Sequence, residues 1–141
     1  MTLLISIIIL GLVFDYINGF HDAANSISTI VTTKVLTPVQ AVIWAAFFNF
    51  IAFFISKYII GEFGIANTVS KTVYEHYITL PIILAGVIGA IIWNLLTWWK
   101  GIPSSSSHTL IGGFAGAAIM ANGFGAIHGS VILKIASFIF L

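Results

Sequence analysis

The chain has 141 residues, of which 60% are hydrophobic and 6% are charged, with a formal net charge of +1. Because few soluble domains could cover so much apolar surface, this composition indicates an integral membrane protein. The small net charge argues against a nucleic-acid partner, and the absence of cysteine excludes disulfides and thiolate metal sites. The apolar runs are long and continuous, which favours an all-α polytopic protein with room for four or five spanning helices.

The first apolar segment starts near Thr2, stays apolar to Phe14 and then carries polar residues until Lys34. A straight helix of that length exceeds a hydrocarbon core of roughly 30 Å. Since Gly and Asn weaken a helix locally, we expect a break or kink at Asn18–Gly19. The N-terminus has neither a basic region nor a small-residue cleavage site, so we interpret it as a retained first helix rather than a signal peptide.

The second apolar segment has a clear start signal. Thr37 is expected to cap a helix that has Pro38 in its first position and continues to Lys57–Tyr58. The following residues, 61–78, contain both glutamates and one lysine. They indicate an interfacial loop or a short surface helix.

The third apolar segment begins at Pro81 and ends in WWK at 98–100, a combination typical of a membrane boundary. The next apolar part, Thr109–Ala121, is too short to cross a membrane alone. It favours a re-entrant or half-length helix whose ends are surrounded by protein or water. Residues 127–141 have the pattern of a further helix, and because they stop on apolar residues we expect the chain to be truncated inside that helix.

Polar residues recur at steps of three or four along the first segment, so a helix would place them on one face. They are Asp15, Asn18, Asp22, Asn25, Ser26, Thr29 and Thr33. An aspartate at the centre of a spanning helix costs about 2.5–3.5 kcal/mol on an insertion scale, so it is expected to have a partner. The stripe can hydrogen-bond to neighbouring helices, or its hard oxygen ligands can coordinate Na⁺ or carry protons. We favour the cation, with Asp22, Asn25 and Ser26 close enough to share one ion.

Four consecutive serines, Ser104 to Ser107, follow Pro103. If Pro103 takes the first helical position, the amides of Ser104, Ser105 and Ser106 lack intrahelical acceptors and, with the four hydroxyls, form an anion site that needs no basic side chain. The same run can instead cap a helix and line a turn. A Ser104–His108 nucleophile pair for proteolysis is a third interpretation, which we set aside because nothing marks an oxyanion hole.

Small and isolated polar residues complete the pattern. The glycines Gly112, Gly113 and Gly116 are expected to let their helix approach other helices closely, with Gly112 and Gly116 as a GxxxG pair. Three isolated polar residues in the second and third segments are expected to hydrogen-bond between helices. These are Asn49, Asn94 and Thr97.

An anion-binding helix start and a cation-binding stripe, each at an interrupted segment, match the logic of a secondary transporter. Three stretches then carry a resemblance: GFHDAANSI at 19–27, TPVQA at 37–41 and WNLLTWWKGIPSSSSHTLIGG at 93–113. Together they resemble the inorganic phosphate transporter family. The resemblance runs over nearly the whole chain, with both motifs in the family's order.

The resemblance implies phosphate import coupled to Na⁺ or H⁺, with some family members carrying a neutral metal–phosphate complex and related proteins assigned to sulfate. It also implies a fold of two inverted repeats, each with a D-x-x-N-S motif and a serine-rich hairpin. On that basis Asp22, Asn25 and Ser26 belong to the ion and phosphate site, and Ser104 to Ser107 belong to the phosphate-binding hairpin. The role of His21 stays open.

This chain has one copy of each motif, so residues 1–141 are expected to form a single transmembrane domain, the first inverted repeat. It is either a fragment, which we favour, or a half that assembles with an oppositely oriented copy as a homo-oligomer. We expect a non-enzymatic, multi-pass protein of the cell membrane that transports phosphate by cation-coupled alternating access without a cofactor. A sulfate transporter of the same fold and a non-transporting helical subunit are the alternatives.

Overall fold

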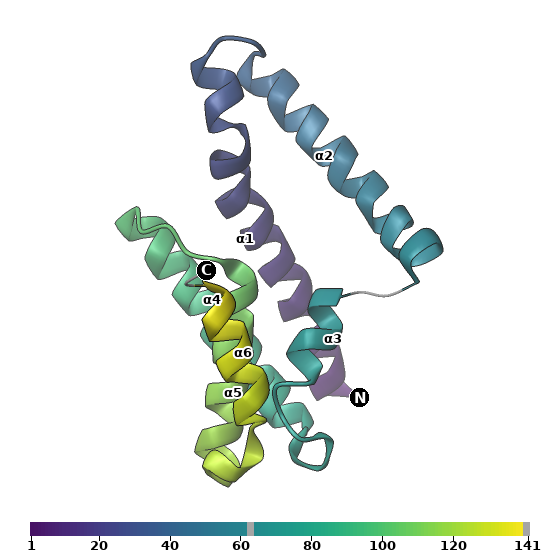
Figure 1. The fold of residues 1–141 in the computed structure, drawn as a ribbon, viewed down its shortest axis with the longest axis vertical. Helices are drawn as coiled ribbons and strands as arrows, with labels where there is room; N and C mark the ends of the chain where they lie inside the picture. The colour runs from purple at the N-terminus through teal and green to yellow at the C-terminus, as the bar shows by residue number, and fades with distance from the viewer. Residues whose placement is uncertain (62–63, 140–141) are drawn as a thin grey trace. The chain divides into compact units, whose positions relative to one another are not determined.

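The computed structural model describes residues 1–61 and 64–139, and these form a helical protein (Figure 1). The α-helices in chain order are α1 (Thr2–Thr32), α2 (Pro38–Ile55), α3 (Gly64–Ser70), α4 (Leu80–Lys100), α5 (Ser106–Asn122) and α6 (Gly129–Ile139). Shorter helical turns are η1 (Ser56–Ile60), η2 (Glu75–Tyr77) and η3 (Phe124–Ala126). The described residues contain no strand and one isolated β-bridge, between Val73 and Ile127. The predicted all-α class is confirmed.

Three of the described helical stretches are long and apolar enough to span a membrane: Thr2–Thr32, Pro38–Ile60 and Leu80–Lys100. The described ranges therefore contain three helices long enough to span, fewer than the four or five for which the sequence has room, while α5 and α6 are shorter helices. Helix α5 has 17 residues, which confirms that the segment after the serines is shorter than a full span. Helix α6 confirms the expected last helix as far as Ile139, and residues 140–141 lie outside the described ranges.

The expected break in the first segment is absent, because helix α1 continues through Asn18 and Gly19 as one hydrogen-bonded helix of 31 residues. The boundary between two compact units of the chain falls between Ile17 and Asn18, so the expected kink stays a prediction. Neither residue costs more than about 1 kcal/mol of helix propensity. In apolar surroundings that cost is small beside the cost of leaving backbone groups without hydrogen bonds, so the helix persists.

The start of α2 is confirmed in detail. The Thr37 side chain accepts from the Gln40 amide, while the Gln40 side chain accepts from the Thr37 amide at 3.0 Å, so the two form a capping box ahead of Pro38. The helix ends through the η1 turn at Gly61, whose φ of 74° suits glycine. Helix α3 and η2 confirm a short surface helix within 61–78, and Glu62 and Phe63 of that stretch lie outside the described ranges.

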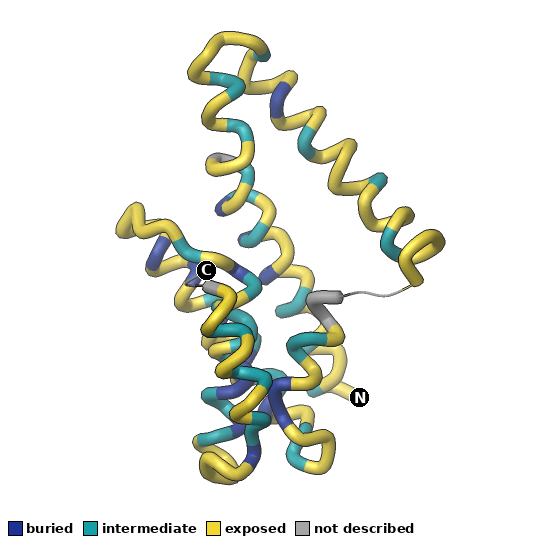
Figure 2. The backbone as a smooth tube through the Cα atoms, viewed as in Figure 1, coloured by how far each residue is buried: buried dark blue, intermediate teal, exposed yellow. Residues whose placement is uncertain are grey.

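The chain divides into two compact units, and each is described by itself. The unit Asn18–Gly64 contains the end of α1 and all of α2. Ala41 is the one buried residue of α2, and most of the helix is exposed (Figure 2). The aromatic side chains of α2 contact one another. The Trp44 and Phe48 rings, for example, are stacked with centroids 5.6 Å apart. This apolar exterior fits a hydrocarbon environment.

The other unit combines Met1–Ile17 with Ile65–Leu141, and its best-packed part is the pair of α4 and α5. Its buried apolar cluster consists of Val73, Ile82, Phe114, Ala118 and Ala126. The two helices are held close because glycines face each other. A Cβ on Gly86 would lie 2.9 Å from the Phe114 Cα, and one on Gly113 would overlap the Gly86 carbonyl oxygen.

Candidate functional site

The serine cluster forms the start of α5, but in a different register from the expected one. The helix begins at Ser106, with Ser105 as its N-cap. The Ser105 hydroxyl accepts from the His108 amide at 3.5 Å, and its carbonyl accepts from the Thr109 amide at 2.9 Å. The expectation that Pro103 occupies the first helical position is therefore wrong. A serine that caps with its own side chain sets a better helix start than a proline placed two residues earlier.

The four serines differ in their environments. Ser105 is exposed, Ser104 and Ser107 are half-buried, and Ser106 is buried with 3% of its surface accessible. The amides of Ser106 and Ser107 lie in the first turn, where a helix offers no backbone acceptor. The positive end of the helix dipole lies at the same place. The start of α5 therefore combines unsatisfied amides with hydroxyl groups, which is the chemistry that holds an oxyanion.

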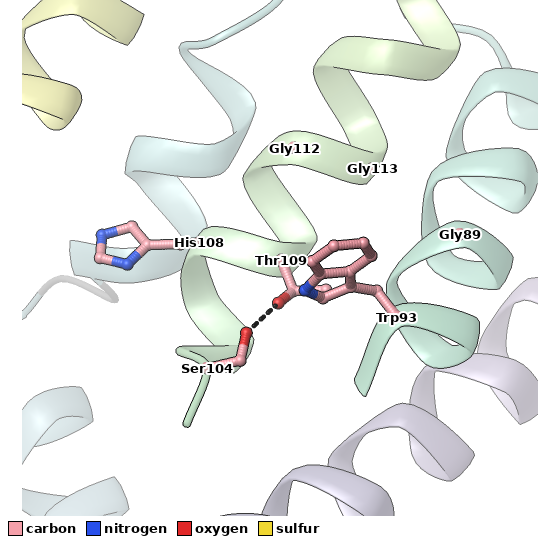
Figure 3. A pocket seen from close by; sticks show the side chains of 7 residues that line it. All are labelled: Gly89, Trp93, Ser104, His108, Thr109, Gly112 and Gly113. Carbon is pink, nitrogen blue, oxygen red and sulfur yellow. Dashed lines mark hydrogen bonds between the residues drawn. The ribbon is translucent and has the colours of Figure 1, made fainter. Parts of the chain in front are cut away.

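A pocket of about 420 Å³ lies against this helix start, between α4 and α5 (Figure 3). Its lining residues are Gly89, Trp93, Ser104, His108, Thr109, Gly112 and Gly113. The Ser104 hydroxyl lies 3.4 Å from the Thr109 hydroxyl, whereas the His108 ring extends away from Ser104. A Ser–His nucleophile pair is thus not formed, and the pocket offers hydroxyl groups and the Trp93 ring instead.

The expected hydrogen bonds between helices are absent at Asn94 and Thr97, both of which are buried on α4. The Thr97 hydroxyl donates to carbonyls of its own helix, those of Trp93 at 2.9 Å and Asn94 at 3.1 Å. The side-chain nitrogen and oxygen of Asn94 have no hydrogen-bond partner within the described part of the chain. Neither side chain forms a hydrogen bond between the described helices.

The acidic motif lies on α1, in the unit Asn18–Gly64. Asp22, Asn25 and Ser26 are exposed and share one face of the helix. The Asp22 carboxylate lies 3.3 Å from Nδ1 of His21, which is buried. The Ser26 hydroxyl donates to the Ala23 carbonyl at 3.1 Å, which leaves its oxygen lone pairs available to a cation.

The two motifs belong to different units, so each is placed only within its own unit. Within the residues that the structure describes, no three His, Cys, Asp or Glu side chains gather as a metal site. A cation at Asp22 would therefore depend on neutral oxygen ligands such as Asn25 and Ser26. The binding roles of both motifs stay predictions.

Comparison with known proteins now bears on this arrangement. Residues 18–141, which include both motifs, match the model of the phosphate transporter family. The chain belongs to the phosphate transporter family. Membership confirms the resemblance seen in the motifs. It also agrees with the long apolar helices in identifying a multi-pass integral membrane protein.

Curated members of the phosphate transporter family align with most of this chain. A probable low-affinity inorganic phosphate transporter of Rhizobium meliloti (strain 1021) is 50% identical over 95% of the chain and 39% of its own length. The protein of the same description in Bacillus subtilis (strain 168) is 48% identical over 96% of the chain and 40% of its own length. The low-affinity inorganic phosphate transporter PitB of Escherichia coli (strain K12) is 36% identical over 77% of the chain and 22% of its own length.

The chain thus spans about two fifths of the length of the first two relatives. No solved structure matches it. Three pocket residues, Gly89, Trp93 and Thr109, are not among the site residues expected from the sequence, although Trp93 and Thr109 lie in the stretch at 93–113 that carries the family resemblance. Their place in that stretch was the available signal.

Proposed function

We propose that the full-length protein moves inorganic phosphate across the cell membrane by alternating access, coupled to Na⁺ or H⁺. The observation that carries this proposal is the start of α5, where first-turn amides and serine hydroxyls meet beside a pocket. Family membership supports the same function. The described relatives are named as low-affinity inorganic phosphate transporters, which makes phosphate the first anion to test.

Phosphate binding is proposed at Ser104, Ser105, Ser106 and Ser107. Hydroxyl groups and the amides of the first turn donate to phosphate oxygens, and the helix dipole favours negative charge there. Neutral donors leave the anion bound more weakly than a guanidinium would. Weak binding suits a carrier that must also release its substrate.

Cation binding is proposed at Asp22 with Asn25 and Ser26. These residues supply carboxylate, amide and hydroxyl oxygens on one face of α1. We propose that Asp22 and Asn25 also take part in the phosphate site. Without a cation or proton, the Asp22 carboxylate would repel an incoming phosphate; occupancy by a cation removes that repulsion, and this couples the two ions.

A second copy of both motifs is proposed to complete the transporter. The chain spans about two fifths of its first two relatives, so the remaining length has room for an inverted second repeat. An oppositely oriented copy of this chain would serve the same purpose. The exposed apolar surface of α2 would then lie against that repeat or against lipid.

Uptake of labelled phosphate by vesicles containing the full-length protein tests the proposal. We expect uptake that requires a Na⁺ or pH gradient, and separate imposition of the two gradients identifies the coupling ion. Excess phosphate should compete better than sulfate. A protein that takes up no phosphate and is not stabilised by phosphate against heat would instead be a non-transporting subunit, because a ligand that binds the folded state must stabilise it.

The exposed cap residue Ser105 offers a charge-only test of the anion site. Asparagine and aspartate are both good N-caps, so Ser105→Asn and Ser105→Asp should each keep the melting temperature of the wild type. The aspartate alone adds negative charge beside the proposed phosphate. We expect Ser105→Asp to lower phosphate uptake at least tenfold relative to Ser105→Asn. Equal uptake by the two variants would contradict anion binding at this helix start.

A further inference from the structure

Three buried polar atoms near the start of α5 lack hydrogen-bond partners. They are Nδ2 and Oδ1 of Asn94, a residue with 0% of its surface accessible, and Oγ of Ser106, a residue with 3% accessible. Such groups are rare in folded proteins because burial removes them from water without replacing the lost hydrogen bonds. Within the described ranges, Asn94 is the one residue whose side-chain donor and acceptor are both in this state.

The pairing of α4 and α5 places Asn94 opposite the first turn of α5. Gly86 contacts Phe114 and Gly113, and Gly113 also contacts Ala90, so the two helices run antiparallel. One further turn along α4 leads from Ala90 to Asn94, the matching step on α5 leads from Gly113 back to about Thr109, and Ser106 lies about one turn beyond Thr109. Asn94 and Ser106 therefore belong to the same end of the helix pair.

The unpartnered atoms are enclosed by this chain itself. Because each exposes essentially no surface, a segment outside the chain cannot reach them while α4 and α5 keep this arrangement. The Thr97 hydroxyl beside them is committed to carbonyls of its own helix. A partner for Asn94 must therefore enter when the two helices separate at this end. Residues 101–105, which include Gly101 with a φ of 64°, connect the two helices at this end.

We propose that Asn94, together with Ser106, recognises the protonated form of the phosphate anion and sets the preference for phosphate over sulfate. This inference rests on the proposed function. The Asn94 amide nitrogen and the Ser106 hydroxyl donate to unprotonated phosphate oxygens. The Asn94 carbonyl oxygen accepts from a P–OH group. A single anion that both accepts and donates hydrogen bonds can therefore satisfy the three atoms that lack partners.

Other ligands leave part of this set unsatisfied. A cation suits Oδ1 and Oγ, but it cannot accept a hydrogen bond from Nδ2. Sulfate at neutral pH has no hydroxyl group, so it leaves Oδ1 without a donor in an enclosed site. A site that hydrogen-bonds a substrate hydroxyl rejects the analogue without that hydroxyl strongly, because the polar atom of the protein is then buried and unpaired. Asn94 is therefore a specificity-determining residue.

The experiment replaces Asn94 by leucine, which has the same branching and number of side-chain heavy atoms but no polar atoms, in the full-length protein. Inhibition of labelled phosphate uptake by unlabelled phosphate, arsenate and sulfate is measured in vesicles, together with the melting temperature. We expect the preference for phosphate over sulfate to fall at least tenfold. Arsenate, which is protonated like phosphate, should follow phosphate. The melting temperature should hold or rise, because the substitution removes unsatisfied groups.

Asn49→Leu is the matched control, since Asn49 is an exposed asparagine of α2. It should leave the preference unchanged. Asn94→Asp keeps an acceptor and should keep the preference for phosphate over sulfate while weakening the binding of both anions. If the leucine variant fails to fold, Asn94→Asp tests the inference in its place.

Two results would overturn the inference. An Asn94→Leu protein that melts at a lower temperature and keeps its anion preference would show that Asn94 is a structural hydrogen-bonding residue. Loss of the preference in Asn94→Asp to the same extent as in the leucine variant would remove the role of the acceptor oxygen. A wild-type protein that neither transports phosphate nor is stabilised by it would instead refute the proposed function, and the inference with it.

Discussion

Replacing Asp22 with asparagine is expected to lower gradient-driven phosphate uptake by roughly 10- to 100-fold. A unit charge 4 Å from a cation contributes about 4 kcal/mol at an effective dielectric constant of 20. The Asp22 side chain is 51% exposed, so solvent screening reduces this contribution to about 1.5–3 kcal/mol. The asparagine keeps the size and one oxygen of the aspartate but removes the charge. Initial uptake rates in vesicles, normalised to the amount of folded protein, measure the effect.

The cation dependence separates this role from a structural one. Residual uptake by Asp22→Asn should no longer respond to the Na⁺ or pH gradient that drives the wild type. Glu75→Gln is the control, because Glu75 is an exposed carboxylate in the short η2 helix, outside both motifs. It should transport at the wild-type rate. If Asp22→Asn kept both its rate and its gradient dependence, the cation site would have to lie elsewhere.

Replacing Gly113 with alanine is expected to disrupt the pairing of α4 and α5. The added Cβ would overlap the Gly86 carbonyl oxygen, and backbone atoms cannot move aside as the end of a flexible side chain can. Overpacking of this kind costs about 1–3 kcal/mol. Loss of the pairing would also displace the start of α5, so the variant should show a lower melting temperature in detergent and at least tenfold less phosphate uptake.

Gly112→Ala is the control at the neighbouring position. A Cβ on Gly112 has no neighbouring atom within 4 Å in the described structure, and alanine is a better helix former than glycine. Its melting temperature should equal or exceed that of the wild type. Similar destabilisation by both alanines would mean that the effect of Gly113→Ala does not arise from its contact with Gly86.

Local capping chemistry made several helix boundaries predictable from the sequence. Thr37 and Pro38 mark the start of α2, because the Thr37 side chain accepts from the Gln40 amide and Pro38 has no amide hydrogen to satisfy. Helix α4 likewise begins near Pro81 and ends at Lys100, where Gly101 takes a left-handed conformation. Signals of this kind are complete within a few residues, so one sequence suffices to interpret them.

Two boundary predictions failed where a local preference competed with its surroundings. Asn18–Gly19 favours a break in isolation, but α1 keeps its backbone hydrogen bonds through both residues. Pro103 favours a helix start, but the Ser105 side chain offers a cap two residues later and α5 starts after it. In both cases the residues have the expected local preference, but a more favourable interaction determines the helix boundary: the backbone hydrogen bonds of α1 in the first case and the Ser105 cap in the second.

The residue types of the candidate site could be predicted, but their environments could not. Four adjacent serines look alike in a sequence, whereas Ser106 is buried and Ser105 is exposed, because burial depends on which side of α5 faces α4. The sequence likewise does not reveal the environment of Asn94, which was expected to hydrogen-bond between helices. Its lack of hydrogen-bond partners among the described residues follows from the glycine-mediated approach of the two helices, which only three-dimensional packing determines.

The aromatic exterior of α2 has a consequence for handling the protein. Its rings contact one another and Ala41 is its one buried residue, so in the described structure little tertiary packing supports the helix. Its conformation then depends on the amphiphile that surrounds it, and short-chain or poorly matched detergents will affect α2 before they affect the glycine-paired α4 and α5. Amide protons of α2 should accordingly exchange at rates that vary with acyl-chain length, while those of α4 stay nearly constant.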